Sequence, residues 1–303
     1  MVAAALAERR PNLRSKRAAQ LFLLPAIVVL GLLLAAPVIY SIWLSLTDAS
    51  LAAGRLDTPF AGLENYARLF GDKSVHNALL NTIYFAAVEV TSVVTLGLLV
   101  ALLLNHPLGR WSGFRVLLLL PWAIAPVANA VLWKWIYHSN YGVLNALLLE
   151  LGIIDSNVTW LGEPFRALNM LLLVDIWKST PFIAILLLAA LQSIPRMQYR
   201  AARVDGANGW QSFRYITLPA LKTPLAIATI LQTIWSLRTF DLIYVLTKGG
   251  PADGTVVMNF LAYRVTFNFL QFGYGAAIAN LIFLTSLVLA ILYMRLLKPG
   301  GRR

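Results

Sequence analysis

The chain contains no cysteine, only three histidines and few charged residues, which make up 13% of its 303 residues. Without cysteine, no disulfide pattern can indicate a redox compartment. The histidines, at positions 76, 106 and 138, are scattered, and no clustered acidic motif such as D-D-x-x-D is present. A transferase embedded in a membrane needs such clustered acids or a set of metal ligands, so the sequence does not support that class of enzyme.

Long apolar runs are abundant, because hydrophobic residues make up 59% of the chain and the mean hydropathy is +0.72. This is more apolar surface than one soluble core would use. A transmembrane helix needs about 20 predominantly apolar residues. We therefore predict an all-α, polytopic membrane protein with six transmembrane helices in one domain. The predicted spans are residues 21–46, 78–104, 116–137, 167–191, 224–246 and 275–294.

The net charge of +12 is explained by membrane topology and not by a nucleic-acid partner. Of the 25 basic residues, 16 flank the predicted spans on the side of both termini, 6 lie on the opposite side and 3 lie inside spans. Because basic residues concentrate in cytoplasmic loops, both termini are predicted to be cytoplasmic. The expected location is the bacterial cytoplasmic (inner) membrane.

The N-terminal region has five basic residues followed by an apolar run, as a signal peptide does. The apolar core of a signal peptide has roughly 7–15 residues, and this run is longer. We therefore predict an uncleaved first span. The predicted organisation is a cytoplasmic tail over residues 1–17, a transmembrane domain over 18–298 and a cytoplasmic tail over 299–303. Residues 194–222 form the longest predicted cytoplasmic loop.

This loop has the signals of two short helices. Ser193 can cap the first helix, Pro195 suits its opening turn, and Gly206 can end it in the left-handed conformation. Ala201 and Ala202 leave its surface nearly flat, which lets another protein approach closely. A plain amphipathic connector is the alternative.

The second helix of the loop can begin with a capping box, in which Asn208 and Gln211 satisfy each other's backbone N–H groups. Its side chains Trp210, Phe213 and either Ile216 or Thr217 then project to one side. Such a face suits packing beneath the membrane domain.

Residues 199–219, YRAARVDGANGWQSFRYITLP, resemble the "EAA" signature of ATP-binding-cassette importer permeases. The matching positions are Ala201, Ala202, Gly206, Ile216, Leu218 and Pro219, and Asp205 and Ala207 complete the "DGA" of the sugar-importer branch. The resemblance implies that this loop docks into a cytoplasmic ATPase subunit. The implied coupling residues are Tyr199, Arg200, Ala201, Ala202, Asp205, Gly206 and Ala207. Arg200 stands where the family has glutamate, which puts that residue's pairing with a basic ATPase residue in doubt.

Three further motifs resemble permeases of the maltose and glycerol-phosphate importer type: LLPWAIAP at 119–126, DIWKSTPF at 175–182 and FDLIYVLTKGGP at 240–251. The resemblance runs from about residue 21 to the C-terminus and implies a type I importer permease fold. The last motif places a Gly-Pro turn on the outer face. The implied partners are a second permease subunit, two ATPase subunits, an extracytoplasmic substrate-binding protein and the lipid bilayer. Since the chain lacks a G-x-x-x-x-G-K-[ST] loop, ATP and Mg²⁺ are expected on the ATPase subunits, with no cofactor or metal in this chain.

Ionisable residues inside spans are costly, at about 2.5–3.5 kcal/mol each, and therefore mark a pathway or an ion pair. Asp175 and Lys178 are three residues apart and can neutralise each other on one helix face. Arg238 and Asp241 have the same spacing. Ion pairs that only hold helices together are the alternative. The six ionisable residues inside spans are Glu89, Lys134, Asp175, Lys178, Arg238 and Asp241, of which the first two receive no predicted role.

The resemblance also implies a sugar path, because sugar-contacting positions of maltose permeases can be carried over motif by motif. They fall on Trp122, Pro126, Asp175, Lys178, Ser179, Phe182, Trp235, Ser236 and Thr239. Aromatic rings can lie against the C–H faces of a pyranose while polar side chains bind its hydroxyls. We therefore predict the permease subunit of an ATP-driven, binding-protein-dependent importer for a sugar or sugar derivative, working by alternating access.

Two other transport functions are weighed against this prediction. An importer for a polyamine or an organic anion is the main alternative, but a polyamine site needs surplus carboxylates, and two acids here meet two bases. A secondary transporter would have a proton-relay acid and inverted repeats, and no clear repeat is visible.

Overall fold

The structure is a computed structural model that describes residues 13–51, 59–105 and 117–297. Most of the predicted N-terminal tail and all of the predicted C-terminal tail lie outside these residues, as do Arg110 and Arg115 between the second and third predicted spans. The described residues are mainly helical and contain no β-strand beyond two isolated bridges.

The chain begins with α1 (Leu13–Leu30), the π-helical turn η1 (Gly31–Ala35) and α2 (Ala36–Ser45), followed by α3 (Glu64–Gly71) and α4 (Lys73–Asn105). The middle contains α6 (Leu120–Ala123), α7 (Pro126–Ile136), α8 (Val143–Glu150) and α9 (Pro164–Gln192). Next come α10 (Arg196–Val204), α11 (Gly209–Ser212), η3 (Phe213–Thr217), α12 (Leu218–Ala220) and α13 (Lys222–Leu237). The last elements are α14 (Asp241–Leu246), α15 (Met258–Tyr263), η4 (Arg264–Asn268) and α16 (Phe272–Leu297).

Four of the six predicted spans are helical segments long and apolar enough to cross a membrane: Phe22–Ser45, Lys73–Asn105, Pro164–Gln192 and Phe272–Tyr293. The third and fifth predicted spans are divided. Between α6 and α7, Ile124 and Ala125 are extended, and Pro126 then opens α7. Between α13 and α14, residues 238–240 leave the helical conformation. Two predicted spans are thus built from shorter helices joined end to end.

Pro181 lies inside α9, and the helix continues past it. A proline within a helix removes one backbone hydrogen bond. Helices packed on α9, among them α4 and α13, hold its course in spite of that loss.

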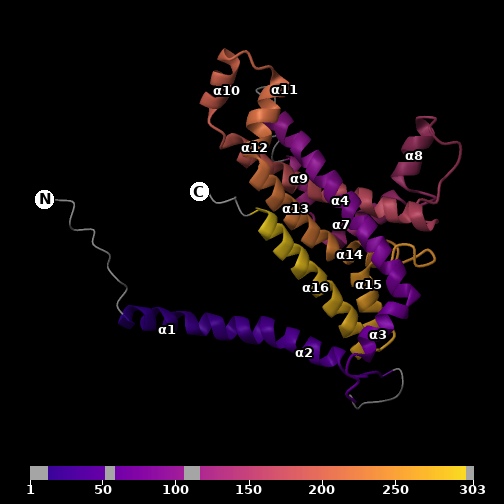
Figure 1. The fold of residues 1–303 in the computed structure, drawn as a ribbon. Coiled ribbons are helices and arrows are strands. Elements are labelled where there is room, and N and C mark those ends of the chain that lie inside the picture. Colours follow the sequence, from indigo (N-terminus) through magenta and orange to yellow (C-terminus); the bar gives the residue numbers. More distant parts are fainter. Residues whose placement is uncertain (1–12, 52–58, 106–116, 298–303) are drawn as a thin grey trace.

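The bundle is organised around α4 and α9, which pack along each other (Figure 1). A Cβ atom at Gly97 of α4 would lie 2.7 Å from the Cγ2 atom of Ile183 on α9, so glycine permits this close approach. The helices α10 and α11 lie at one end of the bundle, and α3 and α15 lie towards the other. The segment α1–α2 projects away, and its most apolar stretch is not buried against the chain.

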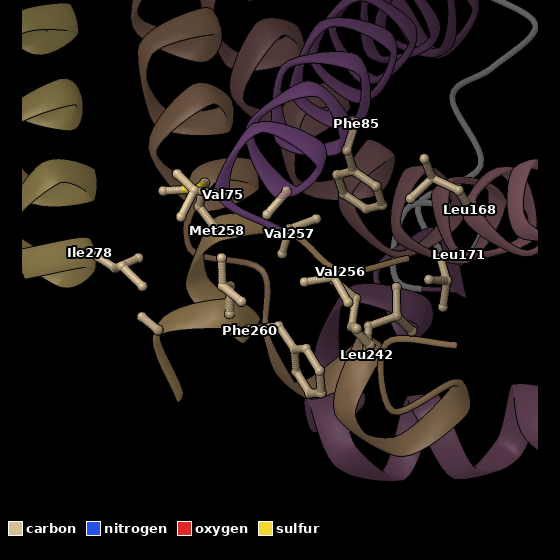
Figure 2. Close-up of a cluster of buried hydrophobic side chains, with 14 of the residues drawn as sticks. Val75, Phe85, Leu168, Leu171, Leu242, Val256, Val257, Met258, Phe260 and Ile278 are labelled. Carbon is tan, nitrogen blue, oxygen red and sulfur yellow. The ribbon is translucent and has the colours of Figure 1, made fainter. Parts of the chain in front are cut away.

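The buried side chains form two hydrophobic clusters at different levels of the bundle. The first lies towards α3 and α15 and includes Phe85, Leu171 and Val256 (Figure 2). The second lies towards α10 and includes Val93 and Ile183. Because α4 and α9 contribute to both clusters, the residues between them on each helix occupy an intermediate layer.

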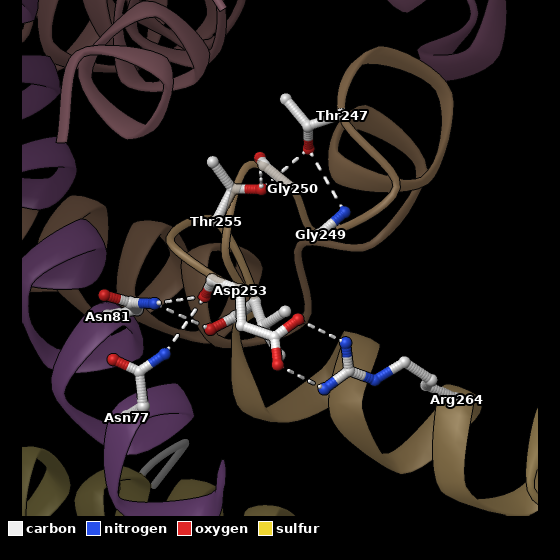
Figure 3. Close-up of polar contacts among 9 residues, drawn as sticks. Asn77, Asn81, Thr247, Gly249, Gly250, Asp253, Thr255 and Arg264 are labelled. Atoms are coloured by element: carbon white, nitrogen blue, oxygen red, sulfur yellow. Dashed lines mark hydrogen bonds and ion pairs between the residues drawn. The ribbon is translucent and has the colours of Figure 1, made fainter. Parts of the chain in front are cut away.

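The loop between α14 and α15 contains the predicted Gly-Pro turn and is tied down by polar contacts (Figure 3). Asp253 forms a two-point ion pair with Arg264, with O–N distances of 2.6 and 3.1 Å. Asn77 and Asn81 of α4 donate to backbone carbonyl groups of the loop. Gly249 has φ +87°, a conformation that glycine adopts without steric cost. The turn is therefore a rigid feature at the end of the bundle away from α10.

Candidate functional site

A cavity of about 320 Å³ lies in the layer between the two hydrophobic clusters. On α4, Glu89 is four residues from Phe85 of the first cluster and four from Val93 of the second. On α9, Asp175, Lys178 and Ser179 lie between Val174 of the first cluster and Ile183 of the second. The two divided spans also meet the cavity at their breaks, where helix ends leave backbone groups free to face a ligand.

The structure brings together most of the predicted sugar-contacting residues. Seven of the nine line the cavity: Trp122, Pro126, Asp175, Lys178, Ser179, Trp235 and Thr239. The other two lie behind its wall. Phe182 packs between two tryptophans of the wall, and Ser236 is buried on α13.

Two tryptophans of the cavity wall pack on a third aromatic ring, Phe182, behind them. The ring centroids of Trp122 and Phe182 are 5.1 Å apart with an interplanar angle of 24°, a stacked arrangement. Phe182 meets Trp235 edge-on, at 5.2 Å and 62°. The two tryptophans remain 41% and 39% exposed, so their surfaces are free to contact a ligand.

The ion pairs predicted from spacing are absent among the described residues. Asp175 accepts a hydrogen bond of 3.3 Å from the hydroxyl of Thr239 and makes no ion pair with Lys178. Arg238 and Asp241 are also unpaired with each other, and the prediction that they share a helix face is wrong. Arg238 ends α13 and Asp241 begins α14, so the break between them removes the helical spacing. All four residues line the cavity.

Sequence reasoning omitted six lining residues from the site: Glu89, Asn129, Arg238, Phe240, Asp241 and Leu242. An acid in the middle of an apolar span was a usable signal for Glu89, which is only 1% exposed. Asn129 is also buried, but a single amide near a proline gave no comparable signal. Lys134, also without a predicted role, is exposed in the last turn of α7 and does not line the cavity. Within the described part of the chain, no group of His, Cys, Asp and Glu residues is suited to hold a metal ion.

The loop over residues 194–222 contains the predicted first helix, α10, with one difference at its start. Ser193 ends α9, where its hydroxyl donates to the carbonyl of Ala190, and Pro195 is the N-cap of α10 without a side-chain hydrogen bond. The prediction that Ser193 caps α10 is therefore wrong, because α9 extends through Gln192 and uses the serine itself.

The end of α10 agrees with the prediction. Gly206 has φ +80°, its N–H donates to Arg203, and the N–H of Ala207 donates to Ala202. This pair of bonds is the Schellman arrangement that closes a helix. The predicted capping box is also present, since Asn208 and Gln211 exchange hydrogen bonds of 2.8 and 2.9 Å.

The predicted coupling residues differ in their exposure. Arg200, Ala201, Asp205 and Gly206 are exposed, and Ala202 and Ala207 are half-buried. Tyr199 instead faces the bundle, where its hydroxyl lies 2.9 Å from that of Thr217 and its ring packs against the second hydrophobic cluster. Sequence reasoning did not include the exposed apolar side chains Met197 and Val204 of α10, the latter 87% exposed.

Comparison with known proteins agrees with this architecture. The chain is 38% identical over 283 residues to the trehalose/maltose transport system permease protein of Thermococcus litoralis, covering 93% of this chain and 94% of that protein. It is 36% identical over 287 residues to the sulfoquinovosyl glycerol transport system permease protein of Agrobacterium fabrum, covering 95% and 92%. It is 37% identical over 277 residues to the lactose transport system permease protein of Rhizobium radiobacter, covering 90% and 91%.

Solved structures share the fold. A bacterial alginate ABC transporter, in complex with a periplasmic protein bound to an alginate pentasaccharide, matches with a TM-score of 0.80. The sequence identity is 23%, and the match covers 95% of this chain and 98% of the other. Residues 93–302, more than half of the chain, match the family of binding-protein-dependent transport system inner membrane components. The chain is thus a permease subunit and not an enzyme, and it belongs to the family of binding-protein-dependent transport system inner membrane components.

Proposed function

We propose that this chain is one of two permease subunits of an ATP-driven importer for a sugar or sugar derivative. The observation that carries the proposal is the cavity between the two hydrophobic clusters. Two exposed tryptophans backed by Phe182 line this cavity together with polar side chains, as expected of a site that binds both the apolar faces and the hydroxyls of a sugar. The named transport functions of the relatives, trehalose/maltose, sulfoquinovosyl glycerol and lactose, support this substrate class.

The distribution of charge supports an orientation with both termini in the cytoplasm. In this orientation α10 faces the cytoplasm, and the loop that contains Asp253 faces outward, towards the substrate-binding protein. The exposed, small-residue surface of α10 is then the docking site for one of two ATPase subunits, which bind ATP and Mg²⁺. The unburied segment α1–α2 is available to lipid and to the second permease subunit.

A mechanical connection joins α10 to the cavity. Tyr199 of α10 contacts Thr217, and both lie beside a cluster in which Leu191 of α9 and Leu221 at the start of α13 are buried. Since α9 and α13 also line the cavity, a movement of α10 is transmitted to both walls. Closure of the ATPase subunits would thereby open the cavity outward to receive substrate, and hydrolysis would reset it.

The balance of charge in the cavity differs from the one expected from sequence. Glu89 joins Asp175 and Asp241, so three acids face two bases, Lys178 and Arg238. The sequence predicted two acids against two bases, whereas the cavity has one carboxylate in excess. This excess favours a polyamine substrate. The aromatic wall and the sugar-transporting relatives favour a sugar more strongly.

The test begins with the substrate-binding protein that works with this permease, screened by thermal shift against neutral sugars, acidic sugars, polyamines and organic anions. The assembled transporter in liposomes is then assayed for ATP-dependent uptake of each compound that binds. We expect saturable sugar uptake, reduced about tenfold or more by Phe182→Ala, because that change removes the support of both tryptophans. Phe269→Ala, at a half-exposed ring away from the cavity, is the control. Uptake of a polyamine in place of any sugar would refute the proposal.

A further inference from the structure

Among the described residues, only one of the two carboxylate oxygens of Glu89 has a hydrogen-bond partner in the interior of the bundle. Its Oε1 atom accepts a hydrogen bond of 2.5 Å from the amide nitrogen of Gln232 on α13, 143 positions away in the sequence. Since a carboxylate only accepts, the amide of Gln232 must present its NH₂ group here. The second oxygen, Oε2, is buried and has no hydrogen-bond partner among the described residues.

Three other polar side-chain atoms show the same lack of a hydrogen-bond partner. The Oδ1 atom of Asn129, the Oγ atom of Ser236 and the Oε1 atom of Gln232 are also buried without a partner in the described part of the chain. Gln232 and Ser236 are one turn apart on α13, and the hydroxyl of Ser236 lies beside the carboxylate of Glu89, to which it can donate. Glu89 and Asn129 are both 1% exposed and both line the cavity. Because buried polar groups are nearly always paired, these unpaired atoms on α4, α7 and α13 indicate an incomplete binding site.

We propose that Glu89 and Asn129, with Ser236 behind them, form a polar recess in the cavity wall that binds two or more hydroxyl groups of a neutral sugar. The inference rests on the proposed function and narrows its substrate class. Three of the four unpaired atoms are acceptors, and a hydroxyl group of the sugar supplies the missing donor. An acidic sugar would instead bring a carboxylate or sulfonate against Glu89 and Asp175, which lie close enough to interact electrostatically.

The aromatic rings and the recess contact different parts of the sugar. The aromatic wall of Trp122, Phe182 and Trp235 offers surface to the apolar faces of a ring. The side chains of the recess are buried, whereas the two tryptophans are exposed. A hydroxyl bound there is recognised strongly, because a ligand without it leaves the buried acceptors unpaired.

The decisive variant is Glu89→Gln, assayed in the complete transporter with its partner permease, ATPase subunits and binding protein in liposomes. Glutamine retains an oxygen for the bond from Gln232 and replaces only the unpartnered oxygen by NH₂. We expect uptake of maltose, trehalose or lactose, whichever the wild type transports, to fall about tenfold or more, with an unchanged or higher melting temperature. Glu150→Gln, the same chemical change at the exposed end of α8, should leave uptake unchanged.

Wild-type uptake by Glu89→Gln would overturn the inference. If that variant fails to assemble, Ser236→Ala tests the same recess, since it removes one unpartnered hydroxyl. We expect at least about a threefold loss of uptake for it, and full uptake would again overturn the inference. The wild type could also transport a digalacturonate as fast as a neutral disaccharide. That result would refute the recess but would still agree with a sugar importer. Transport of no sugar at all would refute the proposed function itself.

Discussion

A single carboxylate, that of Asp72, joins three helices at the end of the bundle away from α10. It accepts a hydrogen bond of 2.7 Å from the hydroxyl of Tyr274 on α16 and one of 2.8 Å from the backbone N–H of Ser74 on α4. Partial burial alone would raise the pKa of Asp72, but these bonds, another from the backbone of Val75 and the nearby Arg68 together lower it. The ionised form is therefore the one that the folded protein favours.

This lowered pKa predicts a pH dependence of stability. Because the pKa of Asp72 is lower in the folded state than in the unfolded state, its contribution is complete above about pH 5 and decreases as the pH falls through the folded-state pKa. In detergent, the melting temperature of the wild type should drop between pH 5 and 3, roughly, by more than that of Asp72→Asn. Equal pH dependence of both proteins would contradict the prediction. Asp155→Asn, at an exposed carboxylate between α8 and α9, provides a matched control.

For individual residues, the sequence predicted most of the residues that line the cavity, but the ion pairs predicted among them were wrong. The motif positions 122, 126, 175, 178, 179, 235 and 239 all line the cavity. The pairing of Arg238 with Asp241 failed because spacing of three has meaning only within one helix, and the helix breaks between them. Whether a local helix persists through residues 238–240 depends on its packing partners.

Among the helices, α10 has a surface that suits docking to another protein, and the structure indicates where to test it. Ala201 is exposed in the middle of α10, whereas Ala202 takes part in the Schellman turn and Gly206 has positive φ. Tryptophan at either of the latter positions would also disturb the helix end. Ala201 is therefore the position where bulk alone is added.

We predict that Ala201→Trp inserts normally into the membrane but loses at least about 90% of ATP-dependent uptake, because one large ring prevents close approach of the ATPase subunit. The measurements are uptake in liposomes and co-purification of the ATPase subunits. Ala146→Trp, at an exposed position of α8, is the matched control and should behave as the wild type. Normal uptake by Ala201→Trp would show that this face is not used for docking.

For the whole molecule, the absence of native cysteine allows a clean test of orientation. Ser156→Cys, between α8 and α9, and Ser193→Cys, at the start of the loop before α10, are conservative changes at exposed positions. We expect a membrane-impermeant maleimide to label the first in intact cells and the second only in inverted vesicles. The reverse pattern would invert the proposed topology. Asp253 is unsuitable for labelling, because its replacement would break the ion pair with Arg264.

The sequence by itself determined the membrane class, the expected topology, the family resemblance and the local features of the loop over 194–222. Each of these depends on signals between near neighbours in the chain. Apolar runs of sufficient length indicate spans, and basic residues beside them indicate orientation. Asn208 with Gln211, and Gly206, form their cap and turn through bonds that reach only a few residues.

Only the tertiary structure decided which residues meet in the cavity and which charges remain unpaired. Glu89 has no partner near it in the sequence, yet Gln232 contacts it from 143 positions away, and the two polar segments of α4 and α9 align because the helices pack together. The division of two spans into shorter helices likewise depends on neighbours that replace lost backbone contacts. Such contacts form between distant segments, and a pattern of hydropathy along one chain carries no information about them.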